Sequence, residues 1–280
     1  MLIKPHDLSL HLNDPQWVIF DCRHDLFDVG KGERLYRDGH IPGAHFANID
    51  TDLSGEKTGR NGRHPLPSPA AFAAFLARHG VAQQAAIVAY DDVGGQFASR
   101  LWWMARWIGL ANVYLLDGGI GQWVAEGRAL STDVPVPRPV ALKATPNPLM
   151  LWSAADVYAH LGDPAYRLID ARAPERYRGE VEPIDPVAGH IPGAVNRFYK
   201  DNLNADLMLR SKDEIAQEFS TLIGDVPPEN VIHQCGSGVT ACMSIFAMEM
   251  AGLKGSKLFP GSWSEWVADP ARPIARGAAA

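Results

Sequence analysis

The sequence predicts an α/β protein with two similar domains, each a mostly parallel sheet with helices on both faces. Three observations lead to this prediction. The chain has 280 residues, which is long for a single domain. Short apolar segments alternate with helical segments, the pattern of parallel sheets. The landmarks of the first half also recur in the second half in the same order, which indicates a duplicated unit.

The duplication rests on three pairs of segments with a nearly constant spacing between partners. The pairs are GHIPGA at 39–44 and 189–194, FDCR at 20–23 and IDAR at 169–172, and DGGIGQW at 117–123 and PGSWSEW at 260–266. The stretch 131–148 carries five prolines, so it cannot continue a helix or a central strand. We therefore predict an N-terminal domain at 1–130, an extended linker at 131–148 and a C-terminal domain at 149–280.

Each half contains the expected strands and helices in the same order. The predicted buried strands are 17–20, 86–89, 167–169 and 230–233. Ser68 followed by Pro69 is a typical helix start and predicts a helix over 70–79. Ser211 with Glu214 forms a capping box and predicts a second-half helix that continues through Leu222.

Composition excludes several classes of protein. The net charge is −6, which gives no basic field for nucleic acid or an anionic membrane. The N-terminus lacks the apolar core of a signal peptide, and no apolar run reaches the length of a membrane span. The cysteines, Cys22, Cys235 and Cys242, neither form a complete disulfide set nor show metal-type spacing. We expect a cytoplasmic protein with no nucleic-acid or membrane partner.

The candidate nucleophile is Cys235, which stands where a predicted strand gives way to a helix. This carboxyl end of a strand is the usual ligand-binding edge of an α/β sheet. Gly236 and Gly238 allow a tight turn whose N–H groups point toward the sulfur, and the following helix adds its positive end. Both effects favour a thiolate and would stabilise a persulfide. Cys22 and Cys242 fit the ordinary role of small core residues.

The duplicated unit, the paired GHIPGA segments, the loop CGSGVTA at 235–241 and the final PGSWSEW together resemble the tandem rhodanese family. This resemblance covers nearly the whole chain and implies two rhodanese-like domains, of which only the second is catalytic. Aligned on the last landmark, Asp92 occupies the position of Cys235, so the first copy is predicted to be inactive. The family implies sulfur transfer through a Cys235 persulfide, with Gly236, Gly238, Val239 and Thr240 at the substrate.

The residues after the cysteine bear on the sulfur donor. Thiosulfate-using members of the family carry cationic side chains there, whereas Gly236 and Ser237 resemble the mercaptopyruvate type. Arg176 matches the arginine that binds the substrate carboxylate, which a guanidinium can grip through two hydrogen bonds. Mercaptopyruvate enzymes often have a second arginine several residues further on, and Asp185 stands in its place here.

The resemblance also implies a catalytic triad near the donor. Ser237 matches the family's serine, His64 its histidine and Asp50 its aspartate. Asp50 would orient His64, which would polarise Ser237 beside the substrate carbonyl. By contrast, His40 and His190 precede the same Ile-Pro-Gly-Ala in both halves, so we expect them to be structural.

The predicted reaction is 3-mercaptopyruvate sulfur transfer in two half-reactions, releasing pyruvate and then passing sulfur to cyanide, a small thiol or thioredoxin. These residues require no metal or organic cofactor. One alternative is thiosulfate as donor, with Arg176 and Arg178 at the sulfonate. Another is a non-catalytic persulfide relay or protein-binding module. A phosphatase of the Cys-x5-Arg type is excluded, because Ala241 stands where its phosphate-binding arginine is required.

Overall fold

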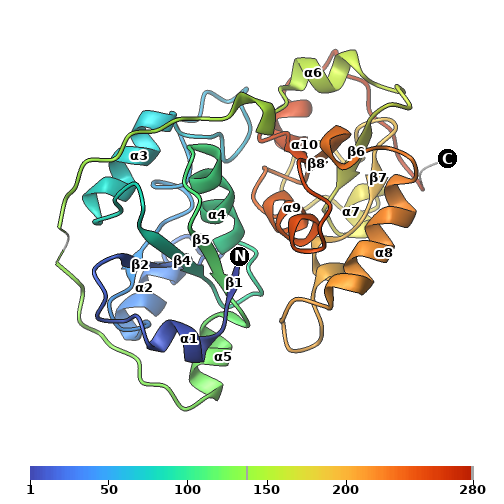
Figure 1. Ribbon diagram of the computed structural model, residues 1–280. Helices are drawn as coiled ribbons and strands as arrows, with labels where there is room; N and C mark the ends of the chain where they lie inside the picture. Colours follow the sequence, from blue (N-terminus) through green and yellow to red (C-terminus); the bar gives the residue numbers. More distant parts are fainter. Residues whose placement is uncertain (137, 279–280) are drawn as a thin grey trace. The chain divides into compact units, whose positions relative to one another are not determined.

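The computed structural model describes residues 1–136 and 138–278 (Figure 1). Pro137 of the predicted linker and the last two residues of the predicted second domain lie outside the described residues. The chain divides into two compact units, each a parallel sheet flanked by helices, which confirms the predicted fold class. In the described part of the chain, no helix is both long and apolar enough to cross a membrane.

The first unit comprises Met1–Gly55, Leu66–Asn147 and Ala205–Leu209. Its five strands lie in the order β1-β5-β4-β2-β3, and every pairing is parallel. The strands are β1 (Leu2–Ile3), β2 (Trp17–Asp21), β3 (His45–Phe46), β4 (Ala86–Tyr90) and β5 (Val113–Leu116). The helices are α1 (Pro5–Ser9), α2 (Lys31–Asp38), α3 (Pro69–Arg78), α4 (Ala98–Trp107) and α5 (Gly119–Ala125).

The second unit comprises Glu56–Pro65, Pro148–Asn204 and Arg210–Ala280. Its four parallel strands lie in the order β7-β6-β8-β9. The strands are β6 (Arg167–Asp170), β7 (Val195–Asn196), β8 (Val231–Gln234) and β9 (Lys257–Leu258). The helices are α6 (Ala154–Ala159), α7 (Pro174–Tyr177), α8 (Lys212–Ile223), α9 (Ala241–Met250) and α10 (Ser262–Trp266), with short 3-10 turns at Pro148–Met150, Tyr199–Asn202 and Pro228–Asn230.

The compact units differ from the predicted domains by two exchanged segments. Glu56–Pro65 comes from the first half of the sequence but packs with the second unit, and Ala205–Leu209 belongs to the first. Two backbone hydrogen bonds hold the predicted linker against the first unit. The Val140 N–H donates to the Ala77 carbonyl at 3.0 Å, and the Asn147 N–H donates to the Trp107 carbonyl at 2.9 Å. The linker has no helix or strand among its described residues before Pro148.

Local signals account for the helix starts. Ser68 caps α3 by accepting the Ala71 N–H at 3.1 Å, and Pro69 is its first residue. Ser211 and Glu214 form the predicted capping box at the start of α8. Each arrangement satisfies N–H groups that the first helical turn leaves without a partner.

The repeated His-Ile-Pro-Gly segments hold equivalent structural positions. His40 Nδ1 lies 2.7 Å from the Tyr36 carbonyl oxygen, and its ring stacks on Tyr36 at 4.0 Å between centroids. His190 Nδ1 lies 2.8 Å from the Tyr177 carbonyl oxygen, and the two rings stack at 3.8 Å. The same arrangement in both units agrees with the predicted structural role.

Candidate active site

Cys235 follows the last residue of β8 and begins the loop that leads into α9 (Figure 1). The residue is only 2% exposed. The Gly238 N–H donates to the Cys235 sulfur at 3.2 Å, so the loop turns a backbone donor toward this atom as the sequence predicts. The N-terminal end of the ten-residue helix α9 begins six residues after the cysteine. A backbone donor and a helix terminus both stabilise negative charge on sulfur.

The loop is held in place by the segment that begins α10. The Trp263 N–H donates to the Cys235 carbonyl at 3.0 Å, and the Ser264 N–H donates to the Gly236 carbonyl at 2.9 Å. The Cys235 N–H in turn donates to the Ser262 hydroxyl at 3.1 Å. This direct contact explains why PGSWSEW accompanies the cysteine loop in the sequence.

Gly238 is required by both its backbone angle and its surroundings. Its φ is +74°, a left-handed conformation that glycine adopts without strain. A Cβ at this position would lie 2.2 Å from the Pro260 carbonyl oxygen, far inside contact distance. The close approach of loop and segment thus leaves no room for a side chain.

Ser237 and His64 form a buried pair beside the cysteine. The Ser237 Oγ and the His64 Nδ1 lie 2.8 Å apart, and each residue is 5% exposed. His64 comes from Glu56–Pro65, the first-half segment that belongs to the second unit. The structure therefore brings together two members of the predicted triad, which are 173 residues apart in sequence.

Asp50, the third predicted member, belongs to the first unit. Its carboxylate Oδ2 lies 3.7 Å from Nε2 of His24, whose side chain is almost fully buried. The partnership of Asp50 with His64 stays a prediction.

Arg176 lies in α7 and is bound by two acidic residues. Its Nη2 donates to Glu182 at 2.6 Å and to Asp185 at 3.3 Å. Burial acts to raise the pKa of Glu182, but hydrogen bonds from Arg176 and from the backbone bring it below its ordinary value. Burial raises the pKa of Asp185 despite nearby arginines. Arg178, in contrast, pairs with Glu180 and is 37% exposed.

A further cation, Arg63, stands at this site and was not singled out from the sequence. Its Nη1 donates to Asp185, and its backbone N–H donates to the Ser264 hydroxyl at 3.0 Å. A Cβ placed on Gly236 would lie 2.8 Å from Arg63 Nη2 and 3.6 Å from both terminal nitrogens of Arg176. Two guanidinium groups therefore border the residue directly after the cysteine.

The remaining predicted substrate residues complete the loop. The Val239 carbonyl accepts the Cys242 N–H at 3.1 Å, and the Thr240 carbonyl accepts the Met243 N–H at 3.1 Å, which joins the loop to the first turn of α9. Cys242 is buried and donates its S–H to the Gly238 carbonyl at 3.4 Å. Substrate contact by Val239 and Thr240 stays a prediction.

The corresponding loop of the first unit begins with an aspartate. The last residues of β2 and β4 are paired, as are the last residues of β6 and β8. The residues that follow β4 and β8 are Asp91 and Cys235. The register therefore places Asp91, and not the predicted Asp92, at the cysteine position. The shift of one residue arises because the spacing between the two copies changes between landmarks.

The Asp91 carboxylate occupies the centre of its own loop. It accepts N–H groups from Val93 at 3.0 Å, Gly95 at 2.8 Å, Phe97 at 2.8 Å and Ala98 at 3.0 Å. Burial nevertheless raises the pKa of Asp91. In the first unit, a fixed carboxylate therefore follows the strand that corresponds to β8. The inactivity of the first copy stays a prediction.

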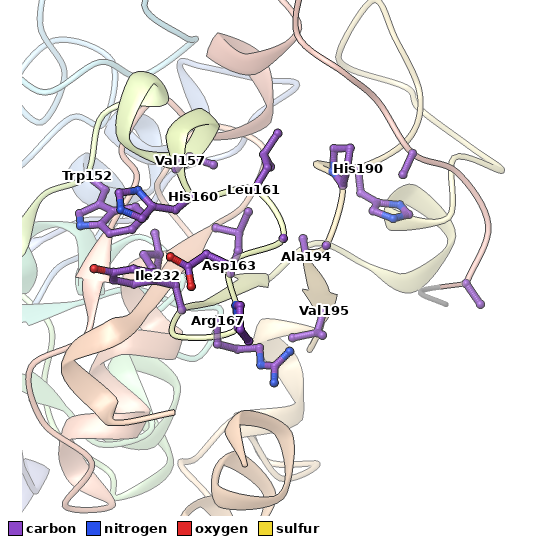
Figure 2. A pocket seen from close by; sticks show the side chains of 18 of the residues that line it. Trp152, Val157, His160, Leu161, Asp163, Arg167, His190, Ala194, Val195 and Ile232 are labelled. Carbon is purple, nitrogen blue, oxygen red and sulfur yellow. The ribbon is translucent and has the colours of Figure 1, made fainter. Parts of the chain in front are cut away.

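The second unit also contains a pocket of about 510 Å³. Figure 2 shows side chains that line it. Its lining includes Trp152, His160 and Arg167 but not Cys235. Arg167 is the first residue of β6, whereas Cys235 follows the last residue of β8, and the two strands are parallel. The pocket and the cysteine therefore belong to different ends of the sheet.

Comparison with known proteins agrees with the predicted fold. The Rhodanese-like domain family matches residues 4–126 and 153–269. The "Probable 3-mercaptopyruvate sulfurtransferase" of Pseudomonas aeruginosa is 46% identical over 99% of this chain and 98% of its own length. The "Thiosulfate sulfurtransferase" of Mus musculus is 33% identical over 96% of this chain and 89% of its own length.

Solved structures give the same result. The 3-mercaptopyruvate sulfurtransferase from Leishmania major is 31% identical, with a TM-score of 0.83 over 95% of this chain and 74% of that one. The chain belongs to the rhodanese family, which confirms the resemblance predicted from its motifs. These relatives are sulfurtransferases, and they agree with the predicted class of activity.

Proposed function

We propose that the protein is a sulfurtransferase that takes sulfur from 3-mercaptopyruvate onto Cys235 and passes it to a nucleophilic acceptor. The observation that carries this proposal is the Cys235 sulfur, which accepts a loop N–H at 3.2 Å beside the Ser237–His64 pair. Such an environment suits a thiolate nucleophile and an anionic persulfide.

In the first half-reaction, the Cys235 thiolate attacks the thiol sulfur of 3-mercaptopyruvate. A sulfur–sulfur bond forms while the carbon–sulfur bond breaks, and its electron pair leaves as pyruvate enolate. The thiol proton of the donor ends on the methyl carbon of pyruvate, so the products are pyruvate and an anionic Cys235 persulfide.

Ser237 and His64 would assist the departure of the enolate. A hydroxyl that donates to the developing enolate oxygen stabilises charge where it appears in the transition state. His64 Nδ1, 2.8 Å from that hydroxyl, is within reach to exchange a proton with it. Asp50 is proposed to orient His64, as the family resemblance implies.

In the second half-reaction, an acceptor attacks the outer sulfur and releases the Cys235 thiolate. With cyanide the product is thiocyanate, and charge is conserved. A small thiol or thioredoxin would take the sulfur in the same way. Nucleophilic chemistry at Cys235 needs a reduced thiol, so we propose a reducing setting such as the cytoplasm.

Thiosulfate is the second candidate donor, because relatives that use each donor match this chain and because guanidinium groups border the loop. The neutral residues Gly236 and Ser237 favour 3-mercaptopyruvate. Arg178, expected at the sulfonate if thiosulfate is used, is bound to the surface residue Glu180.

Steady-state turnover of the purified protein with each donor, and cyanide as acceptor, tests the proposal. We expect a higher kcat/KM with 3-mercaptopyruvate and no thiocyanate from Cys235→Ser. A higher kcat/KM with thiosulfate would overturn the donor. Absence of thiocyanate from both donors would favour a persulfide relay to a protein partner.

A further inference from the structure

We infer that Arg63 is the second cation that binds the carboxylate of the sulfur donor, held in place by Asp185. This inference rests on the proposed function and deepens it, because it assigns donor specificity to a residue outside the loop and outside the predicted site.

The space beside Gly236 is bounded by two guanidinium groups. A Cβ on this glycine would lie 2.8 Å from Arg63 Nη2 and 3.6 Å from the terminal nitrogens of Arg176. Gly236 directly follows the cysteine. An anionic group of a donor whose sulfur meets Cys235 would therefore find both cations at the adjacent residue. The absence of a side chain on Gly236 leaves room for the Arg63 guanidinium.

The Asp185 carboxylate accepts hydrogen bonds from both arginines. Arg63 Nη1 donates to one carboxylate oxygen and Arg176 Nη2 donates to the other at 3.3 Å. The Asp185 side chain is 2% exposed, whereas those of Arg63 and Arg176 are 27% and 17% exposed. The carboxylate is therefore covered while both guanidinium groups remain accessible, as a site for an anionic ligand requires.

The backbone fixes the position of Arg63 independently of this ion pair. The Arg63 N–H donates to Ser264 at 3.0 Å, and the Ser264 N–H donates to the Gly236 carbonyl at 2.9 Å. A Cβ on Gly62 would lie 2.8 Å from the Gly261 carbonyl oxygen, so this segment lies directly against the start of α10. Arg63 is thus tied to the same residues that hold the cysteine loop.

This arrangement accounts for the departure at Asp185 noted in the sequence. The second arginine expected several residues after Arg176 is replaced by an acid, but a guanidinium reaches the site from the residue before His64. Position 185 therefore carries a negative charge in place of a positive one, and the Asp185 carboxylate binds the Arg63 guanidinium. The site keeps two guanidinium groups, and two can hold a planar carboxylate more firmly than one.

Turnover of Arg63→Ala with two donors tests the inference. The first donor is 3-mercaptopyruvate, and the second is 1-mercapto-2-propanone, which has the same thiol and ketone but no carboxylate. Loss of a charge-assisted hydrogen bond should lower kcat/KM for 3-mercaptopyruvate by roughly 10- to 100-fold. With the uncharged donor we expect a change of less than about threefold, which also shows that the variant is folded.

Two further variants sharpen the result. Arg63→Lys keeps the charge but cannot form the paired hydrogen bonds, so kcat/KM for 3-mercaptopyruvate should fall between those of the wild type and Arg63→Ala. Arg37→Ala removes an exposed arginine that pairs with Glu33 on α2, and it should leave kcat/KM for both donors within about twofold of the wild type.

Equal losses with both donors would overturn the inference and reduce Arg63 to a residue that only holds the His64 segment. Unchanged kcat/KM in Arg63→Ala would overturn it as well. If the wild type formed no pyruvate from 3-mercaptopyruvate, the proposed function would fail and this inference with it, and that result is distinct from any effect of an Arg63 variant.

Discussion

Replacement of Gly238 by alanine adds a single methyl group but should displace the backbone of the cysteine loop. Gly238 has a φ of +74° and supplies the N–H that reaches the Cys235 sulfur. A methyl group here would lie 2.2 Å from the Pro260 carbonyl oxygen. The backbone of the loop or of its partner segment must therefore move, and the donor to sulfur moves with it.

The expected decrease in the free energy of unfolding has two parts. Left-handed backbone strain costs about 1 kcal/mol for alanine, and relief of the overlap with Pro260 costs about 1–3 kcal/mol more. The free energy of unfolding should fall by about 2–4 kcal/mol. Loss of the N–H donor to an anionic sulfur should slow persulfide formation by roughly 10- to 100-fold.

Gly252→Ala is the matched control for this experiment. Gly252 follows α9 with a φ of +90°, but a Cβ there would meet nothing within 4 Å. Backbone strain should lower the free energy of unfolding of Gly252→Ala by only about 1 kcal/mol, and its turnover should be unchanged. Urea unfolding and the single-turnover rate of persulfide formation measure both effects. If Gly238→Ala matched the control in stability and rate, the proposed role of this loop contact would be refuted.

Three further predictions concern the serine at the enolate, a buried histidine and the aspartate at the cysteine position. Ser237→Ala should lower kcat with 3-mercaptopyruvate by roughly 100-fold. Sulfur transfer from a preformed Cys235 persulfide to cyanide should be unchanged in this variant. Equal losses in both half-reactions would contradict the role of Ser237 at the enolate. Burial lowers the pKa of His233 to about 3 from 6.5, so the stability it contributes is complete above pH 6.5 and is lost as pH falls toward 3. The wild type should therefore lose about 2 kcal/mol more than His233→Gln between pH 7 and 5, measured by urea unfolding, whereas parallel pH profiles would refute this origin. Asp91→Ala should lower the free energy of unfolding by about 2–4 kcal/mol, because four N–H groups lose their acceptor. Asp92 is exposed, so Asp92→Ala should lower it by less than about 1 kcal/mol. Similar losses in the two variants would contradict the assigned register.

Local sequence signals predicted most of the fold. The apolar run at 17–20 lies within β2, and the capped segments after Ser68 and Ser211 form α3 and α8 with nearly the expected bounds. These features depend on side-chain period and on capping residues close in sequence. The two-residue strands β1, β3, β7 and β9 carry too short a pattern to be recognised in this way.

The main features of the site that sequence reasoning missed depend on contacts between distant residues. The Arg63–Asp185 ion pair joins residues 122 apart, and no local pattern predicts that these two side chains meet. Glu56–Pro65 reads as a polar loop of the first half, yet it packs with the second unit. Ser262 and Ser264 lie in PGSWSEW, which was recognised as a landmark, but their hydrogen bonds to the cysteine loop follow only from the fold.

The most direct test of the account is the identity of the residue that carries sulfur. The protein would be incubated with 3-mercaptopyruvate without an acceptor, its thiols alkylated, and its peptides analysed by mass spectrometry. We expect one added sulfur atom on Cys235, none on Cys22 or Cys242, and one pyruvate released per chain. Pyruvate release with the sulfur on Cys242, or persistent formation of a persulfide in Cys235→Ser, would contradict the central claim.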